Sequence, residues 1–474
     1  MKKNTLLLSH LVHAGKRSLF RRSLSVLAVA SSVALLSACE SAPDESVAPA
    51  TELGQLADVQ QAKGMLGVNI LLKAPVTENI LSELKRYGTV KEVIPEINAL
   101  TMLVAADKLE IIQSLAYVDM ANPDAERKGA PVDAVSVADF TGGLNTWNLD
   151  AVNVTELGEG RTVQQDATGV YVGVLDTGLL DSWRQYFPEE RIATQYAKSF
   201  GGGGAVNVGN VAEQPNKWEH DQNSHGTHVT STIIGFNLRG TAINGVAPKA
   251  TIIPVKVLNQ NGSGWSSVIA RGIVYMANLK AGPLKDSPVV VNMSLGGGAL
   301  DAVEKAAVDY AIAQGVIIVA SAGNSGKAGM GYPGAYAPVI SVASAGLKAE
   351  FSVPAWWYAL DVPETLDPNP YYIASYSSIA RSGQDLDVTA PGSNIVGPYQ
   401  NNSGNLSYYY LSGTSMASPH VAGIVALMAQ ENPALRADQA ESVLEAAAVL
   451  LPDWKAEEAG AGFITADAAL GTVQ

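Results

Sequence analysis

The sequence predicts a three-layer α/β protein, whose mainly parallel sheet is covered by helices on both faces, preceded by a small α+β unit. From about residue 146 onward, short buried-strand patterns alternate with helical patterns. Alternation of this kind builds parallel sheets. Residues 65–120 instead show the order strand, helix, strand, strand, helix, strand, which is ferredoxin-like. A chain of 474 residues has room for both parts.

The composition excludes several classes of protein. Hydrophobic residues make up 47% of the chain and charged residues 16%, which is too apolar for a disordered protein. The net charge of −14 argues against a nucleic-acid-binding protein, because phosphate backbones attract basic surfaces. The single cysteine excludes an internal disulfide and a cysteine-based metal site. One long apolar run near the N-terminus is not the pattern of a multi-span membrane protein.

Residues 1–38 have the pattern of an export signal. Basic residues without any acidic one precede an apolar run at 24–36, which is too short to span a bilayer comfortably. The run leads into the only cysteine, Cys39, and the segment 36–39 resembles the lipobox of bacterial lipoproteins. This resemblance implies cleavage before Cys39, acylation of Cys39 and anchoring in a membrane. An ordinary signal peptide followed by a chance cysteine is the alternative.

Two further features bear on where an exported chain would go. Glu40 follows the cysteine in place of the aspartate that often retains bacterial lipoproteins at the inner membrane, so the outer membrane or cell surface is favoured. The pair Arg21-Arg22 loosely resembles a twin-arginine signal, although a chance arginine pair explains it more simply.

The rest of the chain divides into four parts. Residues 39–62 are rich in Ala, Ser, Pro and acidic residues and are typical of a tether. Residues 63–125 form the small unit, which is large enough for a marginal domain that gains from docking on a partner. Residues 126–145 are a loop-like linker, and 146–474 are the α/β domain. In the small unit, strands are expected near 66–72, 90–94, 100–104 and 115–120, and helices at 77–87 and 106–113.

The α/β domain shows buried-strand runs separated by helical patterns. In parallel sheets of this kind, the site lies at the carboxyl ends of the strands. Strands are expected at 170–175, 251–257, 289–293 and 316–321, and helices at 228–236, 268–278, 302–314 and 421–430.

Three segments place reactive side chains at predicted strand ends and helix starts. Asp176 follows a buried strand, His225 opens a helical pattern, and Ser415 precedes the helix at 421–430, with Pro419 expected in the first turn. With their flanking residues and in this chain order, the segments resemble the active-site motifs of the subtilisin-like serine proteases, the subtilase family.

The resemblance extends over nearly the whole chain from Trp147 onward, and it implies a subtilisin-like fold. The unit at 65–120 similarly resembles the inhibitory propeptide of that family. The other matching segments follow in family order at 147–149, 245–248, 255–258, 292–297, 322–324, 332–334, 374–378, 390–392 and 460–464.

The family's chemistry implies a role for each residue. Ser415 would be the nucleophile, His225 the base that takes its proton, and Asp176 the group that fixes the imidazole tautomer. Asn324 and the Ser415 amide would donate to the oxyanion, and in a subtilisin the loss of such a side-chain donor costs about 10²–10³ in kcat. No cofactor is required for this chemistry.

The resemblance also implies how a peptide would bind. An extended substrate would add a strand between two segments, and a pocket would receive the side chain at P1, the residue whose carbonyl is attacked. Glycine at the bottom of this pocket predicts acceptance of large apolar side chains. The residues implied are Gly262, Ser263, Gly264, Ser294, Leu295, Gly296, Ala322, Gly323 and Gly331.

The chain departs from the family in several places. Family members often bind structural Ca²⁺ through a loop after the histidine helix, but here that loop, 236–241, carries Arg239 and no carboxylate, so this calcium site is not supported. His228 and His420 are expected to pack structurally, and the His225–His228 spacing does not fit a zinc site. Two insertions distinguish the chain from compact members of the family. The one at 201–222 is expected to be a surface loop, and the one at 351–373 either a flap near the P1 pocket or a loop that covers a small core of its own.

The sequence therefore predicts a lipid-anchored serine endopeptidase that acts on proteins or peptides. Its own propeptide would inhibit it until self-cleavage between about Asp124 and Thr146. The alternative is a binding lipoprotein built on an inactive protease scaffold, which the intact candidate residues argue against. An esterase or lipase of another fold is disfavoured, because Ser415 lacks the G-x-S-x-G context and the chain order of the triad differs.

Overall fold

The computed structural model describes residues 64–473, except for 129–132, 138–145, 158–159, 202–208, 215, 363–369 and 401–405. The predicted export signal, Cys39, the tether at 39–62 and most of the linker at 126–145 lie outside the described residues. Among the described helices, none combines the length and the apolar character that crossing a membrane requires.

The first described unit is an antiparallel sheet with two helices, in the predicted element order. Its strands follow one another as β2-β3-β1-β4, and every neighbouring pair is antiparallel. The first helix begins after Thr77, whose hydroxyl accepts a hydrogen bond from the Ile80 amide as an N-cap. The elements are β1 (Met65–Leu72), α1 (Glu78–Leu84), β2 (Gly88–Ile94), β3 (Ala99–Ala105), α2 (Leu109–Gln113) and β4 (Val118–Pro123).

The last strand of this unit begins later than predicted. The sequence favoured a strand at 115–120, whereas β4 starts at Val118. After α2 the chain continues to turn, because the Leu115 amide donates to Ile112 O and the Val118 amide donates to Leu115 O. Apolar residues that cover the core from a turn look like strand residues in the sequence, which explains the error.

The second part is built on a mainly parallel central sheet, as predicted. Its order is β10-β13-β9-β15-β16-β17-β18, with β19 paired to β17, and β18 alone runs antiparallel to its neighbour. The four predicted strands are present within one residue of their expected ends. The strands are β9 (Tyr171–Asp176), β10 (Lys198–Ser199), β13 (Thr251–Lys256), β15 (Val289–Met293), β16 (Val316–Ser321), β17 (Ile340–Leu347), β18 (Tyr371–Ile373) and β19 (Val388–Pro391).

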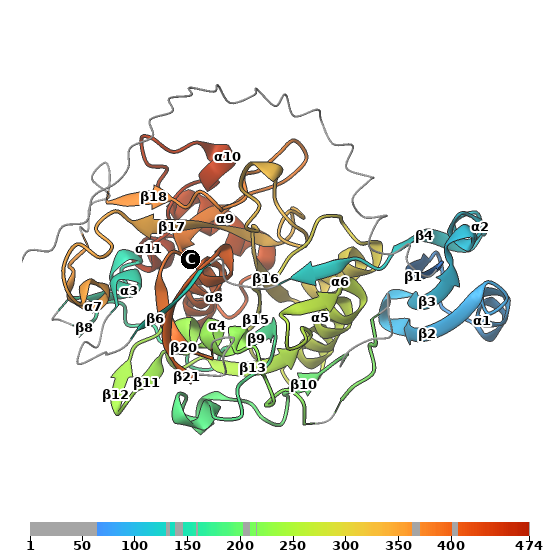
Figure 1. The fold of residues 1–474 in the computed structure, drawn as a ribbon, viewed down its shortest axis with the longest axis horizontal. Coiled ribbons are helices and arrows are strands. Elements are labelled where there is room, and N and C mark those ends of the chain that lie inside the picture. Colours follow the sequence, from blue (N-terminus) through green and yellow to red (C-terminus); the bar gives the residue numbers. More distant parts are fainter. Residues whose placement is uncertain are drawn as a thin grey trace, which may run out of the picture. The chain divides into compact units, whose positions relative to one another are not determined.

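Helices cover both faces of this sheet (Figure 1). Successive strand residues point to opposite cores, so that Ile317 joins the cluster under α4 and α8, and Ile318 joins the cluster under α5 and α6. This arrangement gives the three expected layers. The helices are α4 (His225–Ile234), α5 (Ser266–Ala281), α6 (Ala302–Ala313), α8 (Thr414–Glu431), α9 (Ala437–Ala447), α10 (Ala456–Ala459) and α11 (Ala466–Thr472).

The central helix α8 begins earlier than predicted and contains a proline. It starts at Thr414 rather than near 421, so Pro419 lies inside the helix and not in its first turn. A proline there cannot donate to the carbonyl of Ser415, four residues earlier. The hydroxyl of Ser294 donates to that carbonyl instead, at 2.7 Å. The Ser415 carbonyl therefore still accepts a hydrogen bond, although Pro419 has no amide hydrogen to donate.

Shorter elements surround the sheet. A three-stranded sheet has the order β20-β21-β6, and β11 and β12 form a hairpin whose turn, at Arg239 and Gly240, has positive φ at both residues. These elements are α3 (Trp147–Ala151), α7 (Trp356–Ala359), β5 (Glu126–Lys128), β6 (Asp133–Val137), β7 (Thr155–Glu156), β8 (Gly160–Arg161), β11 (Phe236–Leu238), β12 (Thr241–Ile243), β14 (Ser263–Trp265), β20 (Ile395–Gln400) and β21 (Leu406–Ser412).

The insertion at 351–373 packs on its neighbours through aromatic rings. Trp356 and Trp357 are each only 2% exposed. The Trp356 ring is stacked on Tyr410 of β21 at 5.8 Å and lies 6.2 Å from Trp147 of α3. The described part of this insertion therefore joins the main core on the α4 and α8 side of the sheet, and the expectation of a separate small core under it was wrong.

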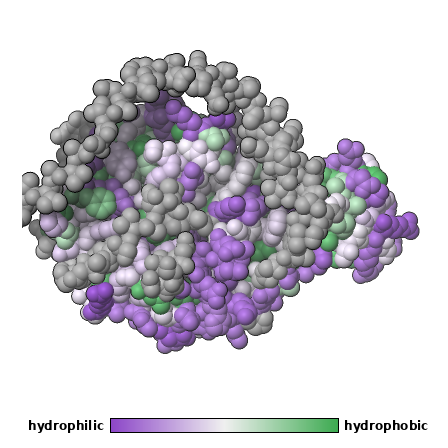
Figure 2. Space-filling model, in the orientation of Figure 1, coloured by the Kyte–Doolittle hydropathy of each residue, from purple (hydrophilic) through white to green (hydrophobic). Residues whose placement is uncertain are grey.

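The described surface is mixed in polarity. In the view of Figure 2, hydrophilic residues gather over the lower part of the molecule and apolar residues form smaller patches. The exposed large apolar side chains are distributed over several places, for example Met120 in β4 and Leu406 in β21, with short runs only at 351–353 and 449–450. Scattered apolar exposure of this kind is ordinary for a folded protein.

Candidate active site

An acid and a histidine meet at the carboxyl end of the central sheet. Asp176 is the last residue of β9, and His225 is the first residue of α4. His225 Nδ1 lies 2.8 Å from Asp176 Oδ1 and 2.9 Å from Oδ2, and both residues are fully buried. Because the carboxylate faces Nδ1, it favours the tautomer with the proton on that atom and leaves Nε2 as the basic nitrogen.

The close approach of α4 to β9 depends on Gly226 and Thr177. A Cβ atom at Gly226 would lie 2.4 Å from Gly178 O and 3.2 Å from Asp176 Cβ, so a side chain does not fit. The Thr177 hydroxyl accepts from the Gly226 amide at 2.9 Å and donates to Asp221 Oδ2 at 2.7 Å. These bonds hold the start of α4 against the end of β9 and so set the distance between histidine and acid.

Asp221 is a site residue that the sequence analysis missed. Its carboxylate accepts hydrogen bonds from the amides of Asn223 and Ser224, at 2.8 Å each, and so shapes the turn that leads into His225. Burial raises the pKa of Asp221 to about 6, although the ammonium group of Lys256 opposes this rise. An acid four residues before the histidine, in a turn rich in Asn and Ser, was the signal that could have revealed it.

Ser415 lies in the first turn of α8, and α8 packs against α4. Its hydroxyl donates to Ser294 O at 3.2 Å. His225 Nε2 is buried and has no hydrogen-bond partner within the described part of the chain. Serine and histidine are thus not hydrogen-bonded to each other here, as is common before a substrate aligns such groups.

Asn324 is oriented by the start of the same helix. It follows β16, and its Oδ1 accepts from both the amide and the hydroxyl of Thr414, at 2.9 Å each. The amide of Gly323 donates to the same hydroxyl at 3.1 Å. With Oδ1 engaged by Thr414, the Asn324 Nδ2 group faces the backbone of Gly413, 3.4 Å from where a Cβ would stand. This side chain is thus fixed in place by Thr414, the residue before Ser415.

The short strand β5 lies between the two segments predicted to bind an extended peptide. It pairs antiparallel with β14, so that Arg127 is opposite Gly264 and Lys128 is opposite Ser263. On its other side, the Lys128 amide donates to Gly296 O at 3.0 Å, and the Gly296 amide donates to Lys128 O at 3.1 Å. The chain's own segment thus makes the backbone bonds that a bound peptide would make.

A second ladder follows a few residues later. In the antiparallel pair of β6 and β21, Asp133 is opposite Ser412, three residues before Ser415. The chain is therefore paired with the candidate site at Lys128 and again at Asp133.

The segments predicted to form the P1 pocket adjoin one another. The Gly331 amide donates to Ala322 O at 2.9 Å, and a Cβ at Gly331 would stand 3.2 Å from the Gly297 backbone. A Cβ at Gly323 would lie 3.3 Å from the Gly331 amide. Side chains at these glycines would fill the space between the segments. The remaining residues predicted for peptide binding lie in β14 or beside it (Gly262, Ser263) and directly after β15 (Ser294, Leu295).

The other histidines near the site have structural partners. His228 Nε2 lies 3.0 Å from Ile395 O, and burial lowers its pKa to about 3. His420 lies 2.8 Å from both Met416 O and the Asn148 amide nitrogen, and burial lowers its pKa to about 4. Both rings are therefore neutral over the ordinary pH range and serve packing.

Two groups of acidic side chains in the described part of the chain lie close enough to share a cation. Neither is the loop 236–241, which forms the β11–β12 hairpin, and either group is compatible with a structural calcium ion. Burial raises the pKa of Asp387 to about 7, and burial together with neighbouring carboxylates raises that of Glu441 to about 7. The two groups are Asp150, Glu156 and Asp361, and Asp385, Asp387 and Glu441.

Replacing Glu441 by glutamine is expected to stabilise the protein at alkaline pH in the presence of a chelator. Because the folded-state pKa is raised, the acidic group stabilises the fold only while protonated, and this stability is lost as the pH rises through about 7. Thermal unfolding should show a higher Tm for Glu441→Gln at about pH 9 and almost no difference at about pH 4, below the ordinary pKa of a glutamate in the unfolded chain. The exposed Glu190, changed to glutamine, is the control. A pH-independent effect would contradict the interpretation.

Replacing Gly226 by alanine is expected to destabilise the fold by about 2–4 kcal/mol, because the new methyl group would press on the backbone of Gly178. Urea unfolding in a Ser415→Ala background, which avoids self-digestion, measures this loss. Gly471→Ala is the matched control, since a Cβ there meets nothing within 4 Å. Equal stability of the two variants would show that α4 can shift without cost.

Comparison with known proteins identifies the family. The model of the Subtilase family matches residues 167–469. Subtilisin DY from Bacillus licheniformis is 35% identical over 288 residues, which cover 60% of this chain and 85% of the relative. Subtilisin Savinase from Lederbergia lenta is 33% identical over 302 residues, covering 64% of this chain and 91% of the relative. A thermostable alkaline protease from Halalkalibacterium halodurans is 32% identical, and the match spans 65% of its length.

Solved structures agree with the predicted fold. Fervidolysin from Fervidobacterium pennivorans superposes with a TM-score of 0.61 at 23% identity, over 86% of this chain and 61% of fervidolysin. Sphericase superposes with a TM-score of 0.53 at 30% identity, over 69% of this chain and 99% of its own. These likenesses confirm the subtilisin-like α/β fold, and subtilases are serine endopeptidases that need no cofactor for catalysis. The chain belongs to the subtilase family and is a subtilisin-type serine protease.

Proposed function

We propose that Asp176, His225 and Ser415 are the catalytic triad of this protease and that Asn324 donates to the oxyanion. Ser415 Oγ attacks the substrate carbonyl carbon while His225 Nε2 takes the hydroxyl proton. The amine then leaves with that proton, and an acyl group remains on the serine. Water attacks this ester with His225 again as the base, which releases the acid and restores the hydroxyl.

The buried pair of His225 and Asp176 is the observation that best supports this mechanism. A histidine held by a carboxylate at 2.8–2.9 Å, with Nε2 unpartnered within the described residues, is poised to accept a proton. The Ser415 amide at the start of α8 and the Asn324 amide, fixed by Thr414, supply donors where negative charge develops. An inactive scaffold that only binds peptides would have no use for this arrangement.

The N-terminal unit acts as an inhibitory propeptide, and the protease matures by cutting its own chain. Two pairings support this proposal. Along the N-terminal segment, Lys128 pairs with Gly296 on one side of the candidate site, and Asp133 pairs with Ser412 on the other side. The bond that is cut therefore lies between Lys128 and Asp133. This interval falls within the broader range expected from the sequence.

The protease has broad specificity with a preference for a large apolar residue at P1. The proposal rests on the resemblance, which places Gly331 at the bottom of the pocket, and on the small residues Ala322 and Gly323 in its wall. Natural substrates are proteins or peptides. A structural calcium ion bound by one of the acidic groups would contribute to stability and not to the chemistry.

Export of the chain from a bacterial cell and lipid anchoring through Cys39 complete the proposal. The basic and apolar pattern of residues 1–38 and the position of the single cysteine support it. The outer membrane or cell surface is the favoured location. Since Cys39 lies on the propeptide side of the cut, maturation would separate the catalytic domain from its anchor.

Replacing Ser415 by alanine is expected to abolish self-cleavage, because the nucleophile is lost. Peptide hydrolysis should fall by a factor on the order of 10⁶, as found for the nucleophile of a subtilisin. Intact mass and N-terminal sequencing of residues 40–474, followed over time, measure both the cut and its position. The wild type should be cut between Lys128 and Asp133, while Ser415→Ala stays whole.

Two controls sharpen this experiment. Ser442→Ala removes an exposed hydroxyl from α9 and should leave self-cleavage intact. Mixing trace wild type with Ser415→Ala separates cleavage within one chain from cleavage between chains. An uncut wild type that also fails to hydrolyse peptides would reject the catalytic proposal in favour of a binding scaffold.

Replacing Cys39 by serine is expected to prevent fatty acylation. Bacterial cells fed an alkyne fatty acid should label the wild type on its N-terminal fragment, because that fragment would carry the cysteine after the cut. The Ser415→Ala variant should carry the label on the full-length chain. Gel fluorescence reports both, and a label that persists in Cys39→Ser would refute the lipid site.

A further inference from the structure

The side chain of Arg127 is buried in an anionic pocket beside the candidate substrate cleft. Arg127 is the middle residue of β5, and its side chain is 0% exposed, whereas those of its neighbours Glu126 and Lys128 are 48% and 65% exposed. This alternation is that of a strand with one side chain directed into a pocket. Arg127 stands opposite Gly264 of β14, in the ladder that a peptide would form.

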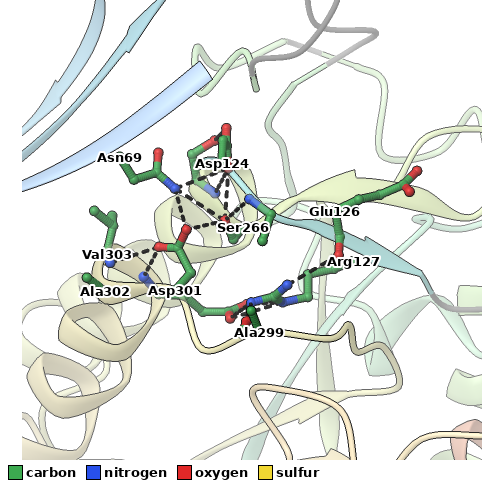
Figure 3. A network of polar contacts seen from close by, with 12 residues as sticks. Asn69, Asp124, Glu126, Arg127, Ser266, Ala299, Asp301, Ala302 and Val303 are labelled. Carbon is green, nitrogen blue, oxygen red and sulfur yellow. Dashed lines mark hydrogen bonds and ion pairs between the residues drawn. The ribbon is translucent and has the colours of Figure 1, made fainter. Parts of the chain in front are cut away.

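The pocket matches the guanidinium group closely. Arg127 Nε lies 3.2 and 3.1 Å from the two carboxylate oxygens of Glu304, and Nη2 lies 2.7 Å from Oε2. Arg127 Nη2 also donates to Ala299 O at 2.8 Å (Figure 3). The forked geometry uses the planar donors of arginine, which the single ammonium group of lysine does not reproduce.

The walls of the pocket also favour a cation of this shape. A Cβ at Gly297 would lie 3.0 Å from Arg127 Nη1 and 3.2 Å from Cδ, so glycine leaves the path open. Glu304 belongs to the first turn of α6, whose N-cap is Asp301. Burial works against the charge on Arg127, but the carboxylates of Glu304, Asp301 and Asp124 outweigh it and raise the pKa of the arginine.

Removal of Arg127 would leave the Glu304 carboxylate buried without its partner. Glu304 is 0% exposed, and a buried carboxylate without a partner is costly. Release of the N-terminal unit takes away Arg127, while Glu304 stays in α6 as part of the protease. The empty pocket then offers the Glu304 carboxylate and the Ala299 carbonyl oxygen to the side chain of whichever substrate residue pairs with Gly264.

We propose that Glu304 is a specificity-determining residue, which selects substrates with arginine at the position that pairs with Gly264. This position lies upstream of the cut bond and is separate from P1. The inference rests on the proposed protease activity and deepens it. The substrate class is proteins or peptides that carry an arginine a few residues before the cleavage site.

Peptides with the chain's own sequence at 124–136 test the inference, with arginine, lysine, citrulline or leucine at position 127. Citrulline keeps the shape of arginine without its charge. The wild-type full chain, after its own processing, should cleave the arginine peptide with a kcat/KM about 10–100-fold above that of the citrulline peptide. The kcat/KM of the lysine peptide should lie between those of the arginine and citrulline peptides.

Variants at Glu304 should change this order. Glu304→Gln is expected to reduce the preference for arginine over citrulline to within about threefold, because the charge-assisted bonds are lost. It should raise kcat/KM for the leucine peptide, because a buried carboxylate no longer opposes an apolar side chain, and this gain would show that the catalytic groups are intact. Asp309→Asn removes an exposed carboxylate from the same helix and should keep the wild-type preference.

A double variant serves as the control for effects on folding. Because Glu304→Gln leaves Arg127 buried with a weakened partner, the double variant Arg127→Leu/Glu304→Leu replaces the ion pair by two apolar side chains. This variant should process itself and should prefer the leucine peptide to the arginine peptide.

The outcomes separate the two proposals. Cleavage that depends on Ser415 but treats all four peptides alike would overturn this inference alone and would show that the pocket serves only to hold the N-terminal unit. An unchanged arginine preference in the double variant would also overturn it. Absence of any hydrolysis that depends on Ser415 would overturn the proposed function.

Discussion

The candidate site depends on one close contact between backbones, the approach of α4 to the end of β9. The hydrogen bonds between His225 and Asp176 are possible because Gly226 lies against the turn after the strand and Thr177 bonds to its amide. The positions of the His225 and Asp176 side chains therefore follow from this contact between backbones. Since α8 packs on α4, the same contact also fixes where Ser415 can stand relative to the histidine. A parallel sheet provides this arrangement naturally, because its strands end and its helices begin at the same edge.

The N-terminal unit is held to the protease by buried polar groups at the starts of α5 and α6. Asp124 accepts hydrogen bonds from the hydroxyls of Ser266 and Ser267, and Asp301 accepts one from Asn69 (Figure 3). Helix N-termini favour such negative groups. Burial and the nearby Asp301 carboxylate raise the pKa of Asp124, so this contact is under electrostatic strain. Polar groups that form hydrogen bonds with one another here can form them with water after separation, which suits the release proposed for the N-terminal unit.

Much of this fold could be predicted because its signals are local. The strand that ends at Asp176 and the candidate reactive residues lie in short segments whose residue patterns predict their local structure. The start of α8 was misjudged because Pro419 suggested a helix boundary, and the compensating hydroxyl of Ser294 lies 125 residues earlier in the chain. The pairing of Arg127 with Glu304 spans 177 residues and has no signature in either segment. Contacts of that kind become visible only once the chain is folded.

In the function proposed above, inhibition and substrate selection use the same strand position, the one that Arg127 holds, and this bears on why an ion pair is buried there. Replacing a buried ion pair by packed apolar residues is often neutral or stabilising, so stability alone does not explain Arg127 and Glu304. A pair of leucines would hold the N-terminal unit at least as well. A carboxylate in the wall of a substrate cleft does something that leucine cannot do, because it penalises every peptide that arrives without a matching cation. Under the proposed selection of arginine by Glu304, a segment that inhibits the protease must carry arginine at this position in order to bind, and its sequence then records what the candidate cleft accepts.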